Sequence, residues 1–272
     1  KPPDLAGRPE FRAFAPTVTE TGPGRFKYGI DWVRLQPDSR CALMAVSVPT
    51  NPSGNLLTQD ELDRLTGLCR QAGIPLVIDL AYGDPFPGIV SRHVTPRFDD
   101  GVVLALSLSK LGLPGVRTGI VVAAPEVVEL IARFNAATVL AGPGLGPALV
   151  TALMQSGQLD VLCREHIEPY YRERRQRALA IAEQSLAGTG ARIHEPEGAF
   201  FLWLELPSVA GGTTALYRRL KERGVLVLPG RALFGDAPVA EAEKDRCLRV
   251  SCAQPDAVLE RGFAAIANEA SA

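Results

Sequence analysis

Mostly apolar runs alternate with amphipathic stretches along the first half of the chain. Four such runs occupy residues 42–48, 76–80, 102–107 and 119–123. Runs of this length without polar alternation, above all the first two, are typical of strands buried on both faces of a sheet. Between these two, Thr58 and Glu61 have the spacing of a capping box and predict a helix that ends before Gly73. Strand, helix and strand in this order indicate a βαβ unit with a largely parallel sheet.

Helical periodicity dominates after residue 125, and short strands then return. The pattern predicts helices over 126–139, 146–156 and 158–187, strands over 200–206, 225–228 and 247–252, and helices over 213–223 and from 255 onward. Residues 1–30 are rich in Pro and Gly and are predicted to be mostly irregular. The change in pattern divides the chain into an α/β domain, residues 1–164, and a smaller α+β domain, residues 165–272.

Composition excludes several classes of protein. The 272 residues are 46% hydrophobic and 22% charged, enough for a large core and about two domains. A formal net charge of −1 gives no basic field for nucleic acid or anionic membranes, and no apolar run approaches the length of a membrane span. The five cysteines form no CxxC pair and the three histidines have no metal-ligand spacing, so we expect a cytoplasmic protein without a metal site. Five of the 29 basic residues are lysines, which makes a lysine inside an apolar segment conspicuous.

Three polar side chains lie where predicted strands give way to loops. Asn51 follows the first apolar run, Asp79 lies near the end of the second, and Lys110 follows the third. Because parallel strands end at the same edge of a sheet, these side chains are predicted to meet where open α/β sheets bind ligands. Each also has a purely structural interpretation, as a turn residue, a loop cap and a surface lysine respectively.

The chemistry of two of these residues is complementary. A carboxylate inside an apolar run, such as Asp79, loses hydration on burial and would be compensated by a cationic ring nitrogen. The amine of Lys110 can act as a nucleophile toward a carbonyl group. Tyr82, three residues after Asp79, is expected at the same edge.

The loop after the third strand has groups that suit a phosphate. Ser107, Ser109 and Arg117 supply hydroxyls and a guanidinium, which are common phosphate ligands. The glycines between residues 112 and 119 allow the backbone to come close to such an anion. The sequence therefore predicts an anion site beside Lys110.

Arg249 is a weaker candidate in the second domain. Strand alternation places it on the face opposite Leu248 and Val250. Most such arginines face solvent, whereas a functional one would hold a substrate carboxylate with two parallel hydrogen bonds.

Two further motifs are interpreted as structural. The glycine-rich residues 142–147 resemble a dinucleotide loop but follow a helical pattern, so we expect a turn between helices. The basic and aromatic stretch Tyr170–Arg177 contains Glu173 and has helical periodicity. A solvated helix face is favoured there over a nucleic-acid site.

The order of these motifs resembles that of a known enzyme family. The relevant segments are VPTNPSGN at 48–55, VIDLAYGDPFPGI at 77–89, LSLSKLGLPGVRTGI at 106–120 and EGAFFLWL at 197–204. Together they resemble the fold-type I, class I and II pyridoxal-phosphate aminotransferases, and within that family the valine–pyruvate group. The resemblance runs from about residue 26 to the end of the chain. It implies the family's large domain with a mostly parallel sheet, followed by its small domain.

The resemblance implies a role for each candidate residue. Lys110 would bind pyridoxal 5'-phosphate covalently and then move a proton, while Asp79 would keep the pyridine nitrogen protonated. Asn51 and Tyr82 would hydrogen-bond the phenolic oxygen of the cofactor. Ser107 and Arg117 would hold its phosphate, with Ser109 as a second-rank candidate. Arg249, with Asn51, would bind the substrate.

The implied reaction is transamination between an amino acid of the alanine or valine type and a 2-oxo acid. The family also implies a cytoplasmic homodimer whose partners are small molecules rather than nucleic acid or membrane. Its members have a front portion of the large domain, with a phosphate-binding turn and a ring-stacking aromatic, that is absent before residue 42 here. We therefore expect this chain to be the C-terminal part of such an enzyme and to have little or no activity alone.

Two other functions stay open on the sequence. Another pyridoxal-phosphate activity of the same fold, such as a carbon–sulfur lyase, would use the same residues. Alternatively, an aminotransferase-like domain can act as the sensor of a transcription regulator, joined to a DNA-binding module. A purely structural role would leave Asp79 and Lys110 without a common ligand.

Overall fold

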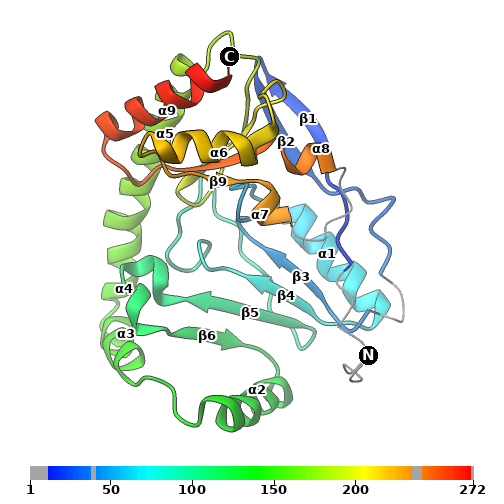
Figure 1. The fold of residues 1–272 in the computed structure, drawn as a ribbon. Coiled ribbons are helices and arrows are strands. Elements are labelled where there is room, and N and C mark those ends of the chain that lie inside the picture. Colours follow the sequence, from blue (N-terminus) through cyan, green and yellow to red (C-terminus); the bar gives the residue numbers. More distant parts are fainter. Residues whose placement is uncertain (1–11, 38–40, 235–240, 271–272) are drawn as a thin grey trace.

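The structure is a computed structural model that describes residues 12–37, 41–234 and 241–270. The described strands form two sheets, one of four strands and one of six, each covered by helices (Figure 1). The fold is therefore built from two layered units, and the site depends on how they meet.

The four-stranded sheet has the order β3-β4-β5-β6. Its strands are β3 (Met44–Ser47), β4 (Leu76–Asp79), β5 (Val102–Ser107) and β6 (Gly119–Val122). The first three are parallel and β6 runs antiparallel to β5, which confirms the predicted largely parallel sheet. In register, Ser47 pairs with Asp79 and Asp79 with Ala105, so the parallel strands end at one edge.

Helix α1 (Gln59–Ala72) connects β3 to β4 and has the predicted ends. Thr58 caps it, accepting a hydrogen bond from the Glu61 backbone, while the Glu61 carboxylate accepts one in return. Gly73 ends the helix in the left-handed conformation, at φ 66°. The buried face of α1 packs against the sheet in one apolar core, through Leu62, Leu65 and others. Local capping chemistry was thus enough to fix this element.

Burial of the strands differs from the prediction. No residue of β3 is buried, and β4 buries Leu76 and Ile78 while Val77 is half-buried and Asp79 is exposed. The sheet edge strand β6 exposes 40% of Val121 and of Val122. The expectation of burial on both faces was wrong because the described elements cover one face of these strands more fully than the other.

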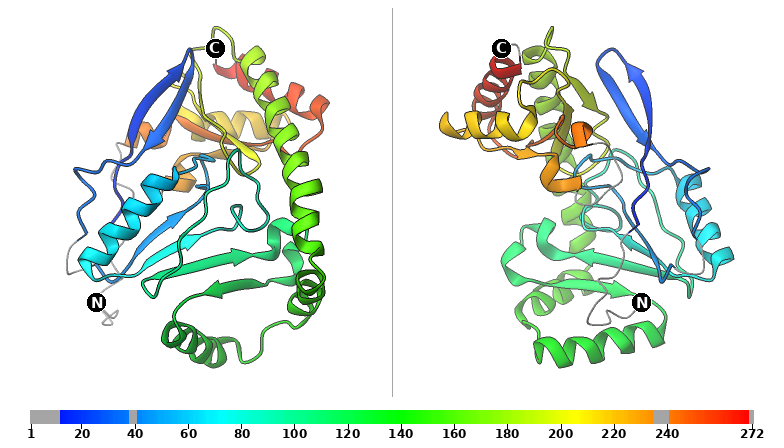
Figure 2. Two further views of the ribbon diagram at one scale, coloured as in Figure 1. Left: turned by 180° about the vertical axis from the view of Figure 1, so that it is seen from behind. Right: turned by 45° about the vertical axis from the view of Figure 1, so that its right-hand side comes forward.

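A series of helices leads from the first sheet to the second. They are α2 (Pro125–Val139), α3 (Leu145–Gln155), α4 (Gln158–Leu162), the π-helical turn Cys163–Ile167 and α5 (Glu168–Ser185). Two 3-10 turns, η1 (Leu108–Leu111) and η2 (Pro114–Val116), lie earlier in the chain, between β5 and β6. Residues 142–144 lie between α2 and α3, as predicted, whereas residues 145–147 form the first turn of α3. Both views of Figure 2 show α5 running beside the two sheets and connecting them. Within the described ranges, no helix combines the length and the apolar character that crossing a bilayer requires.

The six-stranded sheet has the order β1-β2-β7-β8-β10-β9. Its strands are β1 (Thr17–Gly22), β2 (Arg25–Gly29), β7 (Arg192–His194), β8 (Phe201–Glu205), β9 (Leu228–Pro229) and β10 (Cys247–Ser251). Its helices are α6 (Gly212–Glu222), α7 (Arg231–Phe234), α8 (Glu241–Lys244) and α9 (Asp256–Ala270). The apolar faces of α5, α6 and α9 bury a second core with β8 and β10.

The hairpin β1–β2 was not predicted from sequence. Residues 17–29, expected to be irregular, pair with each other, and β2 then pairs in parallel with β7. Phe26 is 1% exposed and packs with Trp203 and Cys247, so an early segment of the chain completes the second sheet. The proposed division at residues 164 and 165 stays a prediction, although this hairpin belongs with the second sheet.

The segment 195–200 holds the two units together. The Ser91 amide donates to the Glu197 carbonyl at 2.7 Å, and the Ala199 amide donates to the Ile89 carbonyl at 2.9 Å. A Cβ on Gly198 would lie 2.6 Å from the ring atoms of Pro49, so only glycine allows this approach. Backbone contact at this point fixes the second sheet against the loops of the first.

The close approach at Gly198 predicts a paired result for two glycine substitutions. Gly198→Ala is expected to lower the free energy of unfolding by about 1–3 kcal/mol, because the added methyl overlaps Pro49. Gly67→Ala, inside α1 with open space around its Cβ, should instead raise it by about 0.5–1 kcal/mol. Denaturant titration followed by circular dichroism measures both, and equal effects of the two variants would contradict the docking geometry.

Candidate active site

Polar residues gather where the parallel strands end. Ser47 ends β3, Asp79 ends β4, and Lys110 lies in the 3-10 turn η1 directly after β5. The Ser107 hydroxyl caps this turn by accepting the Ser109 amide at 3.2 Å. Because the cap fixes the start of η1, it also fixes the direction in which Lys110 leaves the sheet edge.

Asp79 is exposed, which corrects the expectation of a buried carboxylate. One of its oxygens accepts the Ala81 amide at 2.9 Å and the other accepts the Ser47 hydroxyl at 3.3 Å. Being the last residue of β4, Asp79 lies beyond the helix-covered part of the sheet, where its side chain keeps contact with solvent. Asp79 therefore caps the loop that follows β4 through its hydrogen bond with the Ala81 amide, as the structural interpretation expects. The carboxylate is left accessible to a ligand.

Lys110 is half-buried against two aromatic rings. Its Nζ lies 5.1 Å from the centroid of Tyr82 and 5.5 Å from that of Phe200. Both distances are within the range in which an ammonium is attracted to the face of a ring. The amine therefore sits between a loop of the first unit and a residue of the second.

Arg249 joins the same cluster from β10. Its guanidinium donates to the Asn51 side-chain oxygen at 2.6 Å and lies 5.1 Å from the centroid of Phe201. Phe201 in turn contacts Tyr82 edge-on, with centroids 5.8 Å apart. Asn51, Tyr82, Lys110 and Arg249 are thus connected through contacts that span 198 residues of sequence.

The aromatic part of this cluster was missed as a functional feature. Phe200 contacts Tyr82 and stacks on Tyr171 of α5, with centroids 5.0 Å apart and ring planes at 26°. The expectation that 170–177 is a solvated helix face was wrong at Tyr171 and at Arg175, of which 4% is exposed. The signal available in the sequence was the apolar segment 199–204, because its residues Ala199 and Phe200 are the ones that contact Arg175 and Tyr171 of α5.

The electrostatics of Tyr82 report on its neighbours. Burial raises the pKa of its phenol above the ordinary value, and the positive charge of Arg249 acts in the opposite direction. The negative charge of Asp79 raises that pKa further. The charges of a carboxylate from β4 and a guanidinium from β10 thus act on the same phenol, in opposite directions.

Arg117 makes a local contact within its own loop. It is exposed, adopts a left-handed backbone conformation with φ 48°, and donates to the Pro114 carbonyl at 3.1 Å. The Ser107 hydroxyl, engaged as an acceptor, keeps its own proton free to donate to another group. The groups of the predicted anion site thus lie on one stretch of chain, with Ser107 directly before η1 and Arg117 directly after η2.

Taken together, the cluster offers a restricted set of chemical abilities. It combines an amine, an accessible carboxylate, a phenol and a guanidinium at one sheet edge, with aromatic rings beside the amine and the guanidinium. Among the residues that the structure describes, no group of three or more His, Cys, Asp or Glu side chains could hold a metal ion. Covalent and proton-transfer chemistry on a small anionic molecule is what such a set supports.

Comparison with known proteins gives a consistent result. The family model for aminotransferases of class I and II matches residues 25–266. Valine–pyruvate aminotransferase of Escherichia coli K12 is 39% identical over 259 residues, 95% of this chain and 62% of the relative. A 2-aminoadipate transaminase of Thermus thermophilus is 29% identical over 215 residues, which are 76% of this chain and 51% of that relative. The chain thus spans between half and two thirds of these relatives.

Solved structures of similar proteins have the same fold. Valine–pyruvate aminotransferase of Salmonella typhimurium superposes with a TM-score of 0.88 at 39% identity, covering 94% of this chain and 66% of that one. An amino-acid aminotransferase of Psychrobacter arcticum, described as putative in its name, gives 0.91 at 35% identity, covering 95% and 61%. Both sheets are therefore shared with these proteins.

The electrostatic coupling of Tyr82 predicts opposite responses to two substitutions. Asp79→Asn should lower the pKa of the Tyr82 phenol, because it removes a negative charge that opposes ionisation. Arg249→Gln should raise it, because it removes a positive charge that favours ionisation. Carbon-13 tyrosine NMR over a pH titration, with Tyr82→Phe to assign the signal, measures both. Asp60→Asn on α1 is the control, and shifts of the same sign for the two test variants would contradict the geometry.

Proposed function

The chain belongs to the class I and II aminotransferase family, and from that premise we propose that it provides the catalytic lysine of a pyridoxal-phosphate-dependent transaminase. Its architecture is that of the fold-type I aminotransferases. The proposed reaction moves an amino group between an amino acid of the alanine or valine type and a 2-oxo acid. The observation that carries the proposal is the single contact cluster that joins Lys110, Tyr82, Arg249 and Asn51.

The donor set at the sheet edge fits pyridoxal phosphate. An aldehyde requires an amine, a protonated ring nitrogen requires a carboxylate, and a phosphate requires hydroxyl, amide or guanidinium donors. Lys110, Asp79 and the loop from Ser107 to Arg117 supply these three kinds of group at the ends of neighbouring strands. The accessible carboxylate of Asp79 favours this fit, since a fully buried one would be closed to a ring. When bound, the cofactor supplies an electron-withdrawing ring that stabilises negative charge on the substrate carbon.

Lys110 is proposed to hold the cofactor and to move the proton. Its Nζ lies against the Tyr82 and Phe200 rings, which limit the directions that the flexible side chain can take. An amine confined in this way can accept a proton from the substrate carbon and return it to a neighbouring position.

Asp79, Tyr82 and Asn51 are proposed to orient and tune the cofactor. The Asp79 carboxylate, held by Ala81 and Ser47, would accept a hydrogen bond from the ring nitrogen. The Tyr82 phenol is protonated at neutral pH, since burial raises its pKa, and so can donate to an oxygen of the ring. Ser107 and Arg117 would hold the phosphate, with Ser109 as the second hydroxyl.

Arg249 is proposed to bind the carboxylate of the substrate. Its present partner is the neutral side-chain oxygen of Asn51, which a carboxylate can join or displace because the charged acceptor forms a stronger hydrogen bond. The rings of Phe200, Phe201 and Tyr82 lie next to this position and favour an apolar substrate side chain. An aliphatic amino acid agrees with the valine and pyruvate in the name of the Escherichia coli relative.

We also propose a homodimer in the cytoplasm whose other partners are small molecules. Helix α2 supports a further protein contact, since Leu130, Ile131 and Phe134 expose 65%, 41% and 71% of their surface. The five cysteines, all among the described residues, form no disulfide, as suits a reducing compartment. Sedimentation analysis of the full-length protein tests the dimer, and a monomer at micromolar concentration would rule it out.

Removal of the amine should abolish the reaction. In an assay of the full-length protein with L-valine and pyruvate, Lys110→Ala is expected to lower the rate of alanine formation by about a thousandfold or more. Lys221→Ala is the matched control, since this exposed lysine lies on α6 away from the cluster. Alanine formation at equal rates in both variants would reject the role of Lys110. If the unmodified protein formed no alanine, the substrate pair would be rejected instead.

Shortening the guanidinium to an ammonium should affect binding more than turnover. Arg249→Lys keeps the charge but loses the two parallel donors, so KM for both the amino acid and the 2-oxo acid should rise about tenfold or more. Initial rates over a range of both substrates separate KM from kcat. An unchanged KM would show that the substrate carboxylate binds elsewhere.

A further inference from the structure

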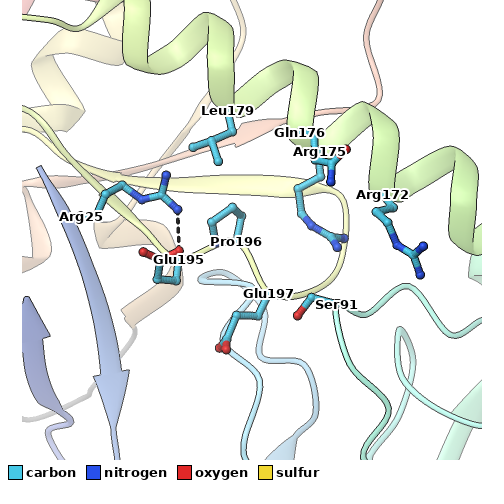
Figure 3. A pocket seen from close by; sticks show the side chains of 9 residues that line it. All are labelled: Arg25, Ser91, Arg172, Arg175, Gln176, Leu179, Glu195, Pro196 and Glu197. Carbon is cyan, nitrogen blue, oxygen red and sulfur yellow. Dashed lines mark hydrogen bonds and ion pairs between the residues drawn. The ribbon is translucent and has the colours of Figure 1, made fainter. Parts of the chain in front are cut away.

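A cavity of about 340 Å³ lies between α5 and the segment 195–197. Figure 3 shows Arg172 and Arg175 reaching from α5 toward Ser91 and Glu197, with Arg25 and Glu195 at the other side. Its lining includes none of Asn51, Asp79, Tyr82, Lys110 or Arg249. The cavity is therefore distinct from the cluster around Lys110.

We propose that this cavity binds a small organic carboxylate, held by the guanidinium groups of Arg175 and Arg172. Three features support this site: the burial of Arg175, the pairing of the other charges around it, and the groups that line the cavity. The proposed site is independent of the transaminase reaction.

Arg175 is a buried cation that forms no ion pair with another described residue. It is 4% exposed, and the hydrogen bond that its guanidinium makes goes to the neutral Ala199 carbonyl at 3.0 Å. Burial lowers the pKa of this guanidinium, since its charge has lost most of its water. In Figure 3 the planar end of Arg175 points away from α5 and into the cavity. A buried arginine is normally matched by an acidic partner, and here the cavity occupies that position.

The other charges of the cavity wall are already paired. Arg25 donates to Glu195 at 2.5 Å and to Glu183 at 2.6 Å, and Arg172 pairs with Glu168 on α5. Glu197 on the opposite wall is likewise paired, with Lys27 and Arg92. Among the described residues of the wall, Arg175 is thus the charged group that takes part in no such pair. A ligand with one negative charge would restore the balance.

The groups that line the cavity suit a small carboxylate with an alkyl group. A guanidinium presents two parallel donors that match the two oxygens of a carboxylate. Leu179 and Pro196 add apolar surface to the wall, which suits a short alkyl group next to the charge. Arg172, with 47% of its side chain exposed, can turn a free N–H toward the same ligand while it keeps Glu168.

The experiment uses isobutyrate, an unreactive branched carboxylate, as the probe. Calorimetric titration is carried out on the full-length protein with Arg249→Leu, so that the proposed substrate carboxylate site does not contribute. One isobutyrate per chain should bind, whereas the isosteric neutral isobutyramide should not. Because neither a cofactor nor turnover is involved, failure here leaves the proposed transaminase activity untouched, and failure of that activity leaves this result standing.

Substitutions in the same background locate the site. Arg172→Gln and Ser91→Asp, both at exposed positions, should weaken isobutyrate binding about tenfold or more, the first by removing a donor and the second by adding a like charge. Arg175→Lys should do the same by losing the two-donor end. Arg177→Gln is the control, because this arginine of α5 pairs with Asp256 away from the cavity. Circular dichroism checks that each variant is folded. If Arg175→Lys does not fold, the affinities of Arg172→Gln and Ser91→Asp decide whether isobutyrate binds in the cavity.

Three outcomes overturn the proposal. Binding of isobutyramide as tight as that of isobutyrate would show that charge plays no part. Equal affinity in Arg172→Gln, Ser91→Asp and the control would place the ligand elsewhere. Binding of inorganic phosphate without binding of isobutyrate would assign the cavity to another class of anion.

Discussion

The docking of segment 195–200 onto the loops of the first sheet is the contact on which the rest of the structure depends. Two backbone hydrogen bonds, at Glu197 and Ala199, join it to residues 89–91, and Gly198 lies against Pro49 where a side chain would not fit. Side chains reinforce the backbone, since Glu197 accepts hydrogen bonds from Lys27, Arg92 and the amide of Leu56. Because three donors from different parts of the chain converge on this one carboxylate, the junction is specific as well as tight.

This junction sets the geometry of the Lys110 cluster. Directly after Ala199, Phe200 turns toward Tyr82 and Lys110, and Phe201 begins β8, next to the strand that carries Arg249. The antiparallel register of β8 and β10 then brings Arg249 to the ring of Phe201 and to Asn51. A small shift of the segment would move the rings and the guanidinium together, because a continuous strand pair connects them. The relative position of the two units is therefore a condition for the chemistry proposed for Lys110.

The parts of the fold that follow local rules could be predicted from the sequence. The ends of α1 follow from Thr58, Glu61 and Gly73, and the bounds of β5 from an apolar run, because the determining contacts lie within a few residues. Asn51, Tyr82 and Lys110 could be located by their positions after strands. The hairpin at 17–29 and the stack of Tyr171 on Phe200 depend on partners far along the chain, which periodicity does not specify. The exposure of Asp79 depends on which elements cover the end of β4, and that too is a property of the assembled fold.

Helix α5 links the cluster around Lys110 with the cavity behind it. Tyr171 and Arg175 are four residues apart, so they lie on one face of the helix, and that face meets two successive residues of the docking segment. Arg175 donates to the Ala199 carbonyl, and Tyr171 stacks on the ring of Phe200. One helix face thus holds the backbone of the segment through a buried cation and its side chain through an aromatic contact. The burial of Arg175 follows from this arrangement: a guanidinium there reaches past Ala199, while its outer donors face the cavity that lies between α5 and residues 195–197.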